Sequence, residues 1–318
     1  MAGSLIISLD FELHWGGAEV WNLEEKSEYF LNTRTVILEM LQLFQEYNIR
    51  VTWATVGFLF ASSREEVMSF SPPKEPSYLN QNLNYFNLFR NNVVGPDEGT
   101  DPFHFGYSLI QEIIKTPGQE LASHTFSHYY CNEEGQTKEE FDLDLQATQK
   151  IAKSKFTKKL TSLVFPRNQY NTSYLELLKD NEYNVIRTNP DVWFWKMNNK
   201  FIPLARALDT LLPISNKLSF KNSDIKEEQD VVLLPASRFF RPYSQKEKSI
   251  QKLKMNRIKK EMLVAAKKGE NYHLWWHPHN FGSFPQQNMI QLREILEYYK
   301  ILNKQYGFSS KNMGDFQR

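Results

Sequence analysis

The sequence predicts an α/β fold in which one domain, residues 1–318, forms a barrel of parallel strands surrounded by helices. Predicted strands and helices alternate over almost the whole chain of 318 residues, which is typical of a parallel sheet. The predicted strands are mostly continuous apolar runs, as expected for strands that are buried on both faces. Polar residues that could carry chemistry follow directly after several of these strands, where catalytic groups gather in β/α barrels.

Hydrophobic periodicity places each element along the chain. We expect strands at residues 5–9, 51–56, 120–122, 162–165, 185–187, 231–234 and 272–276. The first helix is expected to begin at Asn32 or Thr33, because either side chain can cap a helix and apolar residues with helical spacing follow. Further helices are expected at residues 105–114, 138–153, 172–179, 246–268 and 287–306.

Residues 62–106 interrupt this pattern with several prolines and with asparagine-rich and aromatic stretches. A long irregular segment inside a compact domain is usually functional or disordered, and its aromatic residues argue against disorder. We therefore expect a long loop insertion here, which either borders the substrate, packs as an arm or contacts a second subunit.

Composition restricts the class of function. The formal net charge is only +1, so no general attraction to nucleic acid is expected. Cys131 is the only cysteine, which rules out a disulfide within the chain and a cysteine-rich zinc site. No signal-peptide pattern precedes the first strand, and the longest apolar run, residues 51–61, is too short to span a bilayer. We therefore expect a cytoplasmic protein without an integral membrane segment, whose oligomeric state the sequence leaves unknown.

Two histidines and two carboxylates suggest a site for a divalent metal ion. His124 and His128 lie four residues apart, directly after the strand predicted at residues 120–122. Asp10 and Glu12 end the first strand and alternate along it, so both could face one site. Imidazole nitrogens and a carboxylate oxygen are common ligands of such ions and leave room for water.

Four ordered motifs resemble those of a known family. They are Ser8-Leu9-Asp10-Phe11-Glu12, His124-Thr125-Phe126-Ser127-His128, Pro166-Arg167-Asn168-Gln169-Tyr170 and Leu274-Trp275-Trp276-His277. In this order they resemble the polysaccharide deacetylases, which are carbohydrate esterases with a NodB-type homology domain, over roughly residues 4–285. The resemblance implies a distorted (β/α) barrel of about seven strands. It also implies a bound divalent ion, usually zinc and sometimes cobalt or another ion, and removal of acetyl groups from N-acetylated sugars.

The resemblance also implies roles for the residues of the first two motifs. Asp10 matches the catalytic base of the family, and His124 and His128 match its two histidine ligands. The family often has a second aspartate after the base, where this chain has Phe11. Glu12 is the substitute that we expect to bind the metal, and Asp10 is the alternative ligand.

The last two motifs imply the remaining catalytic groups. Arg167 matches the arginine that pairs with the base, and Tyr170 matches the tyrosine whose backbone N–H faces the oxyanion. His277 matches the general acid, although His279 could compete for that role. Asp191 is expected to orient His277. Either Trp193 or Trp195 is expected to form a wall of the acetyl pocket.

These expectations predict a metal-dependent deacetylase, a hydrolase acting on carbon–nitrogen bonds other than peptide bonds. Its expected substrate is an N-acetylated sugar or polysaccharide precursor in surface-polysaccharide or O-antigen-type biosynthesis. Two alternatives remain open, namely an amidohydrolase acting on a linear or cyclic non-sugar amide and a catalytically silent carbohydrate-binding protein. The chain has no Gly-x-Ser-x-Gly element, which argues against a serine hydrolase.

Overall fold

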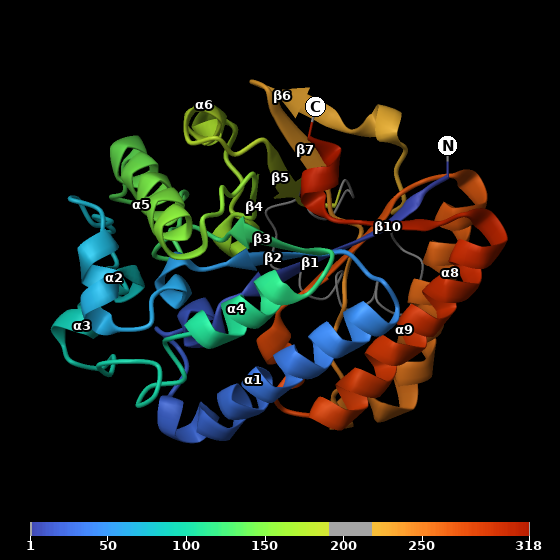
Figure 1. Cartoon of the computed structure of the whole chain (residues 1–318), viewed down its shortest axis with the longest axis horizontal. Coiled ribbons are helices and arrows are strands. Elements are labelled where there is room, and N and C mark those ends of the chain that lie inside the picture. Colours follow the sequence, from blue (N-terminus) through green and yellow to red (C-terminus); the bar gives the residue numbers. More distant parts are fainter. Residues whose placement is uncertain (1, 191–217, 318) are drawn as a thin grey trace.

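The computed structural model describes residues 2–190 and 218–317. A curled sheet of ten described strands forms the centre of the molecule, with helices around it (Figure 1). Nine of the ten strands pair in parallel, and only β6 pairs antiparallel, with β7. The strands are β1 (Ser4–Phe11), β2 (Val51–Thr55), β3 (Gln119–Ser123), β4 (Ser162–Leu163), β5 (Val185–Thr188), β6 (Lys226–Glu228), β7 (Val231–Pro235), β8 (Arg238–Phe239), β9 (Tyr272–Trp276) and β10 (Ser309–Lys311). The predicted α/β barrel class is therefore confirmed.

Strands β7 and β8 are two parts of one extended segment that connects the two sides of the curled sheet. The first part pairs with β5 and the second with β9. Between them, the Ala236 N–H donates to the Thr188 carbonyl at 2.9 Å and the Ser237 N–H donates to the His273 carbonyl at 2.8 Å. The sheet has more strands than the predicted seven or so, because β7 and β8 share one segment and the short strands β6 and β10 are additional.

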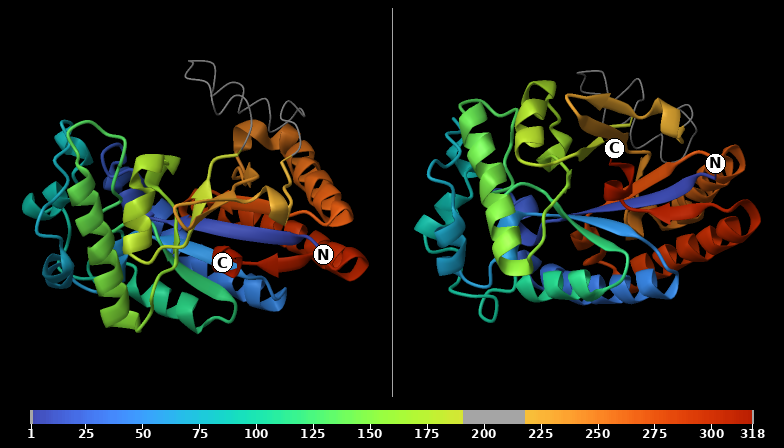
Figure 2. Two further views of the ribbon diagram at one scale, coloured as in Figure 1. Left: turned by 90° about the horizontal axis from the view of Figure 1, so that it is seen from above. Right: turned by 45° about the horizontal axis from the view of Figure 1, so that its top comes forward.

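The helices lie outside the sheet and contact their neighbours in the order α8, α9, α1 and α4, with α5 between α2 and α6. In both views of Figure 2, β1 runs through the middle of the molecule. The helices are α1 (Leu23–Glu46), α2 (Arg64–Phe70), α3 (Phe86–Arg90), α4 (Tyr107–Lys115), α5 (Lys138–Phe156), α6 (Leu175–Asp180), α8 (Gln251–Lys268) and α9 (Pro285–Tyr306). Within the described ranges, none of these helices is long and apolar enough to cross a membrane.

The start predicted for the first helix is wrong. Helix α1 begins at Leu23, because the side chain of Asn22 accepts a hydrogen bond from the Glu24 N–H at 2.8 Å and thus caps the helix. Thr33 lies inside the helix, where its hydroxyl donates to the Tyr29 carbonyl at 2.8 Å. Asn32 is also internal and donates from its amide to the Gly282 carbonyl, beyond β9.

Alternation along β1 determines which of its side chains reach the site. Leu5, Ile7, Leu9 and Phe11 belong to the main hydrophobic core, to which helices α1, α4 and α9 also contribute. Phe11 packs edge-on against Trp53 of β2, with ring centroids 6.2 Å apart. The even-numbered residues of β1 therefore face into the barrel, because successive side chains of a strand point to opposite faces. Asp10 is one of them, and Glu12 is the next residue on that face.

Residues 62–106 pack closely against the barrel and contain helices α2 and α3, which the sequence did not predict. Five of their aromatic side chains are at most 1% exposed, and these are Tyr78, Tyr85, Phe86, Phe89 and Phe105. This burial supports the packing role among the three that were expected for the segment. One of these residues, Tyr85, also reaches the candidate site.

Candidate active site

The candidate site lies at the end of the barrel where the parallel strands terminate. Glu12 follows β1, His124 follows β3 and His277 follows β9. Strand β1 pairs directly with β9 and with β2, which in turn pairs with β3, so these strand ends are neighbours. The barrel thus brings residues together that are up to 265 positions apart in the sequence, at the end where barrel enzymes place their chemistry.

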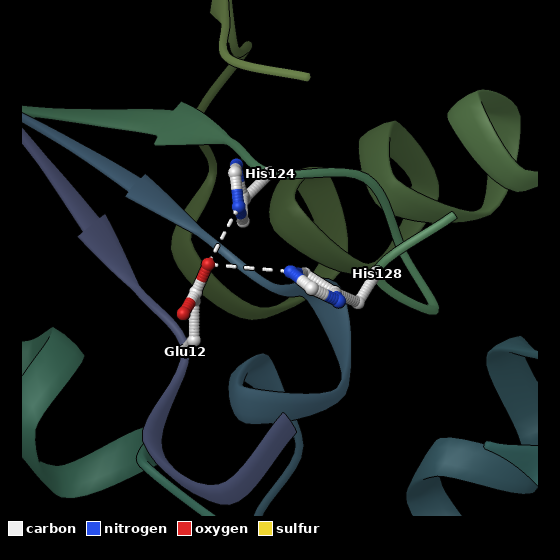
Figure 3. Close-up of side chains that lie close together, drawn as sticks. All are labelled: Glu12, His124 and His128. Carbon is white, nitrogen blue, oxygen red and sulfur yellow. Dashed lines mark hydrogen bonds and ion pairs between the residues drawn. The ribbon is translucent and has the colours of Figure 1, made fainter. Parts of the chain in front are cut away.

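Glu12, His124 and His128 converge on one point (Figure 3). The Oε1 atom of Glu12 lies 2.9 Å from Nε2 of His124 and 3.2 Å from Nε2 of His128. The three side chains are almost completely buried, and their potential ligand atoms lie within 4.8 Å of one another. Two imidazoles and a carboxylate that leave further positions open are a donor set typical of a catalytic zinc site.

The protonation of His124 and His128 supports a cation at this point. Nδ1 of His124 lies 2.8 Å from the Val164 carbonyl, which can only accept, so Nδ1 carries a proton. Nε2 is the nitrogen that faces Glu12, and it offers a lone pair whenever the ring has only one proton. Burial lowers the pKa of His128, which favours its neutral form. Burial alone would raise the pKa of Glu12, but His277, His124 and His128 outweigh it and lower that pKa well below its ordinary value. An ionised carboxylate facing two lone pairs is stabilised by a positive ion between them.

Distances at this point also fit a metal ion. With bonds of about 2.0–2.2 Å, tetrahedral geometry separates neighbouring ligand atoms by roughly 3.3–3.6 Å. The two distances from Glu12 Oε1, 2.9 and 3.2 Å, are only slightly shorter. Small side-chain adjustments are therefore sufficient to admit an ion.

Asp144 of helix α5 shapes the loop that carries both histidines. Its carboxylate accepts hydrogen bonds from the Phe126 N–H at 2.6 Å, the Ser127 N–H at 3.0 Å and the Ser127 hydroxyl at 2.5 Å. Within the loop, Thr125 and His128 have left-handed backbones, with φ of 63° and 57°. The buried carboxylate thus satisfies the amides of a turn that strained backbone angles would otherwise disfavour.

We expect Asp144→Ala to destabilise the protein by about 2–4 kcal/mol, because it leaves two buried N–H groups without their acceptor. Burial raises the pKa of Asp144 to about 6, from 3.8. The folded protein therefore binds this proton more tightly than the unfolded chain, and the stability contributed by Asp144 falls as the pH rises from about 4 to 6. Urea denaturation should show a larger difference between wild type and variant at pH 4 than at pH 8. Asp180→Ala, at an exposed position, is the control and should change stability by about 0.5 kcal/mol or less at either pH.

Asp10 forms a buried, bidentate ion pair with Arg187 of β5. The two terminal guanidinium nitrogens donate to the two carboxylate oxygens at 2.7 Å each. They also donate to the Ser8 hydroxyl at 3.0 Å and to the Asn168 side-chain oxygen at 2.9 Å. The guanidinium lies over the Trp275 ring, 4.3 Å from its centroid.

Burial by itself would raise the pKa of Asp10, but Arg187, together with nearby histidines, outweighs this effect and lowers that pKa. Asp10 is therefore an ionised carboxylate with a fixed orientation.

The expected pairing of Arg167 with Asp10 is wrong. Arg187 occupies both oxygens of Asp10, whereas Arg167 pairs with Glu19. Arg167 lies in the turn after β4 with φ of 54°, and its guanidinium lies over the Tyr130 ring, 4.3 Å from the centroid. Its side chain is 38% exposed, so it borders the site and does not reach into the barrel.

Tyr170 does not offer a free backbone amide. Its N–H donates to the Asn168 carbonyl at 2.9 Å, because Gln169 takes φ of −76° and ψ of 67°, which is an inverse γ-turn. This contradicts the expectation that the Tyr170 amide is available to an oxyanion. Where the family usually has a proline before this tyrosine, the chain has Gln169, and Gln169 is the central residue of the γ-turn.

His277 and His279 differ in exposure and in their access to a substrate. Nε2 of His277 lies 3.6 Å from Asp10 and 3.7 Å from Glu12, and its side chain is 25% exposed. Its Nδ1 lies 3.2 Å from the Asn280 side-chain oxygen. His279 stacks behind it at 4.9 Å and is 4% exposed. Burial, with a contribution from His277, lowers the pKa of His279 to about 3. Only His277 thus combines access with a position beside both carboxylates.

Three of the expected residues lie outside the described part of the chain. They are Asp191, the expected partner of His277, and the two tryptophans proposed for the acetyl pocket, Trp193 and Trp195.

Several residues of the site were not predicted from the sequence. Arg187 gave a signal, because it is a charged residue in an otherwise apolar strand that is buried on both faces. Glu19, Tyr85 and Tyr130 lie in segments without a recognisable motif. Only the fold shows that Tyr130 bonds to His128, that Tyr85 bonds to Tyr130 and that Glu19 bonds to Tyr85.

Comparison with known proteins agrees with this geometry. Residues 31–186 match the model of the polysaccharide deacetylase family. A Mycobacterium smegmatis protein, provisionally described as a polysaccharide deacetylase, matches with a TM-score of 0.61 at 12% identity, over 99% of this chain and 89% of that one. The GH57-type branching enzyme of Pyrococcus horikoshii matches with a TM-score of 0.56 at 12% identity, over 99% of this chain and 70% of its own. The allantoinase PuuE matches with a TM-score of 0.55 at 11% identity, over 99% of this chain and 89% of its own.

At such identities the solved structures support the fold alone. No curated protein matches the chain. The match over residues 31–186, the barrel and the order of the motifs lead to one assignment. Residues 31–186 are identified as a polysaccharide deacetylase domain.

Proposed function

We propose that this protein is a metal-dependent hydrolase that removes the N-acetyl group from a sugar or from a precursor of a sugar polymer. The observation that carries the proposal is the convergence of Glu12, His124 and His128 beside Asp10 and His277. These groups provide a place for a divalent ion, a carboxylate base and a proton donor within one cluster of mostly buried polar side chains. The match of residues 31–186 to the polysaccharide deacetylase family model supports an acetylated carbohydrate as substrate.

Glu12, His124 and His128 would hold the ion, which we propose to be zinc, with cobalt or another divalent ion as a substitute. When bound, such an ion supplies Lewis acidity to the reacting water and carbonyl group. Glu12 is the better carboxylate ligand of the two candidates, because Arg187 already occupies both oxygens of Asp10. Phe11 faces the core and cannot replace the second aspartate of the family.

Asp10 and His277 would transfer the protons of the reaction. Asp10 is ionised and held in place by Arg187, so its carboxylate can accept a proton from water as general base. His277 presents Nε2 to the same space, while its Nδ1 faces the Asn280 oxygen. In the protonated form, Nε2 can therefore donate a proton to the departing amine. Its partial exposure leaves room for the substrate.

Metal content and acetate release together test this proposal. Wild type, purified without chelator, should contain about one divalent ion per chain and release acetate from N-acetylated sugars. His124→Ala/His128→Ala and Glu12→Gln should lose both properties, because each variant removes a ligand of the ion. The control is Glu120→Gln, a partly buried carboxylate near the start of β3 that accepts hydrogen bonds from the hydroxyls of Thr52 and Ser162. This variant should keep its metal and its activity.

Three outcomes would contradict the proposal in whole or in part. Wild type without metal, even after incubation with zinc or cobalt, would exclude a metal-dependent reaction. Sugar binding without acetate release by a metal-loaded protein would identify a silent binding protein. Release of acid from non-sugar amides alone would retain the metal chemistry but overturn the proposed substrate.

A further inference from the structure

A chain of hydrogen bonds leads from His128 to the edge of the site. Nδ1 of His128 lies 2.9 Å from the Tyr130 hydroxyl, which lies 2.9 Å from the Tyr85 hydroxyl. The Tyr85 hydroxyl donates to the Glu19 carboxylate, and Arg167 pairs with the other oxygen of that carboxylate. Both tyrosines are at most 1% exposed. Their hydroxyls therefore depend on protein partners.

The far end of this chain determines the direction of every bond in it. The carboxylate of Glu19 can only accept hydrogen bonds, so the single hydroxyl proton of Tyr85 must be donated to Glu19. In the hydrogen bond between the two hydroxyls, Tyr130 must then be the donor and Tyr85 the acceptor. In the hydrogen bond between Tyr130 and His128, the Nδ1–H of His128 must consequently be the donor and the Tyr130 hydroxyl the acceptor. All three bonds form together only when His128 carries a proton on Nδ1, so the neutral ring has its lone pair on Nε2.

This direction leaves the correct nitrogen free for a metal ion. Nε2 of His128 is the atom that faces Glu12 Oε1 at 3.2 Å. Histidine ligands of metal ions commonly donate their second N–H to a carboxylate or carbonyl, which fixes the tautomer and makes the ring a better donor. In His124 the Val164 carbonyl provides this acceptor directly, at 2.8 Å. In His128 the acceptor is a carboxylate that acts through two tyrosines.

We propose that Tyr130, Tyr85, Glu19 and Arg167 form a positioning relay that fixes the tautomer of His128 and raises its affinity for the metal ion. This inference rests on the metal site of the proposed function. It gives Arg167 a role other than the expected pairing with Asp10. It also gives a role to the segment of residues 62–106, which contributes Tyr85.

Arg167 stabilises the relay in two ways. Its guanidinium pairs with Glu19, whose side chain is only 11% exposed, and balances the negative charge of that carboxylate. It also lies 4.3 Å over the centre of the Tyr130 ring, a favourable cation–π geometry. The ring of Tyr85 is parallel to that of His128, at 9° and 6.0 Å between centroids. These contacts fix the orientations of the Tyr130, Tyr85 and His128 rings relative to one another.

Zinc affinity of the purified protein tests the relay without relying on turnover. Zinc is titrated into metal-free protein against a competing chelator, and cobalt is titrated separately with its visible absorption as the readout of ligand geometry. Tyr130→Phe should raise the zinc Kd about 10–100-fold and alter the cobalt spectrum, because Nδ1 of His128 loses its acceptor. Tyr272→Phe is the matched control, since Tyr272 is also a buried tyrosine, and it donates to Glu261 at 2.7 Å. Its zinc Kd should stay within about twofold of wild type.

A double variant separates the relay from a merely structural role. Glu19→Gln should weaken zinc binding by about tenfold in the wild-type background, because an amide at the end of the chain no longer fixes the direction of the bonds. In the Tyr130→Phe background the same change should have no further effect, since Glu19 acts on His128 only through Tyr130. Equal losses in both backgrounds would overturn the relay, as would an unchanged zinc Kd in Tyr130→Phe. Failure of wild type to bind zinc would instead overturn the proposed function.

Discussion

We expect Arg187→Met to destabilise the metal-free protein by about 3–5 kcal/mol, because it leaves the carboxylate of Asp10 buried and unpaired. Asp10 is 2% exposed and Arg187 is 2% exposed, so water cannot replace the lost guanidinium. Arg167→Met should cost about 1 kcal/mol or less, because its ion pair is partly exposed. Urea denaturation of both variants at neutral pH measures the difference.

Acidification should distinguish the lost pairing from a general packing defect. In wild type the pKa of Asp10 lies below its ordinary value of 3.8. The unfolded chain therefore takes up this proton first, and the stability contributed by Asp10 is present above about pH 4 and lost as the pH falls further. In Arg187→Met, burial shifts the pKa of Asp10 upward, so protonation relieves the buried charge. The stability difference between the two proteins should then narrow as the pH is lowered toward 4.

A second substitution provides the control for this argument. Asp10→Asn removes the charge, so Asp10→Asn/Arg187→Met should be more stable than Arg187→Met alone. Loss of the same free energy in both backgrounds would mean that Arg187 stabilises the fold through packing on Trp275 and not through Asp10. An equal effect of Arg167→Met would contradict the assignment of Arg187 as the partner.

The sequence was sufficient to predict seven of the ten described strands, because their apolar runs must be buried on both faces. The position of Glu12 also followed from strand alternation, since residues 10 and 12 share a face. His124 and His128 follow one strand closely enough for their spacing to indicate a site. The structure brings these residues together as expected, while their roles remain proposals.

Contacts between distant segments could not be predicted in the same way. The choice between Arg167 and Arg187 depends on the backbone angle of a turn and on the inward direction of a β5 side chain, and neither has a sequence motif. The relay behind His128 joins residues from four separate segments. The start of α1 was missed because Asn22 caps it before the apolar periodicity becomes clear. Short strands such as β8 and β10 give too few residues for a pattern.

We expect Asp10→Asn and His277→Ala each to lower kcat by about 10²–10⁴-fold while the protein keeps its metal, because each removes a proton-transfer group and leaves all three proposed ligands in place. Steady-state acetate release gives kcat, and elemental analysis of the same samples gives the metal content. The pattern differs from that of Glu12→Gln, which should lose the metal as well as turnover. His279→Gln is the matched comparison for His277→Ala, and its kcat should stay within about tenfold of wild type, since His279 is buried and its pKa of about 3 keeps it neutral.

The combination of the two measurements assigns each carboxylate separately. Loss of metal from Asp10→Asn would make Asp10 the ligand and leave Glu12 as the candidate base. Nearly full turnover in Asp10→Asn would remove Asp10 from the chemistry and reduce its pairing with Arg187 to a structural ion pair. If His279→Gln lost more turnover than His277→Ala, the general acid would be the buried histidine, and a substrate-induced change would have to expose and protonate it. The partial exposure of His277, and its position 3.6 Å from Asp10, are the reasons for expecting the opposite order.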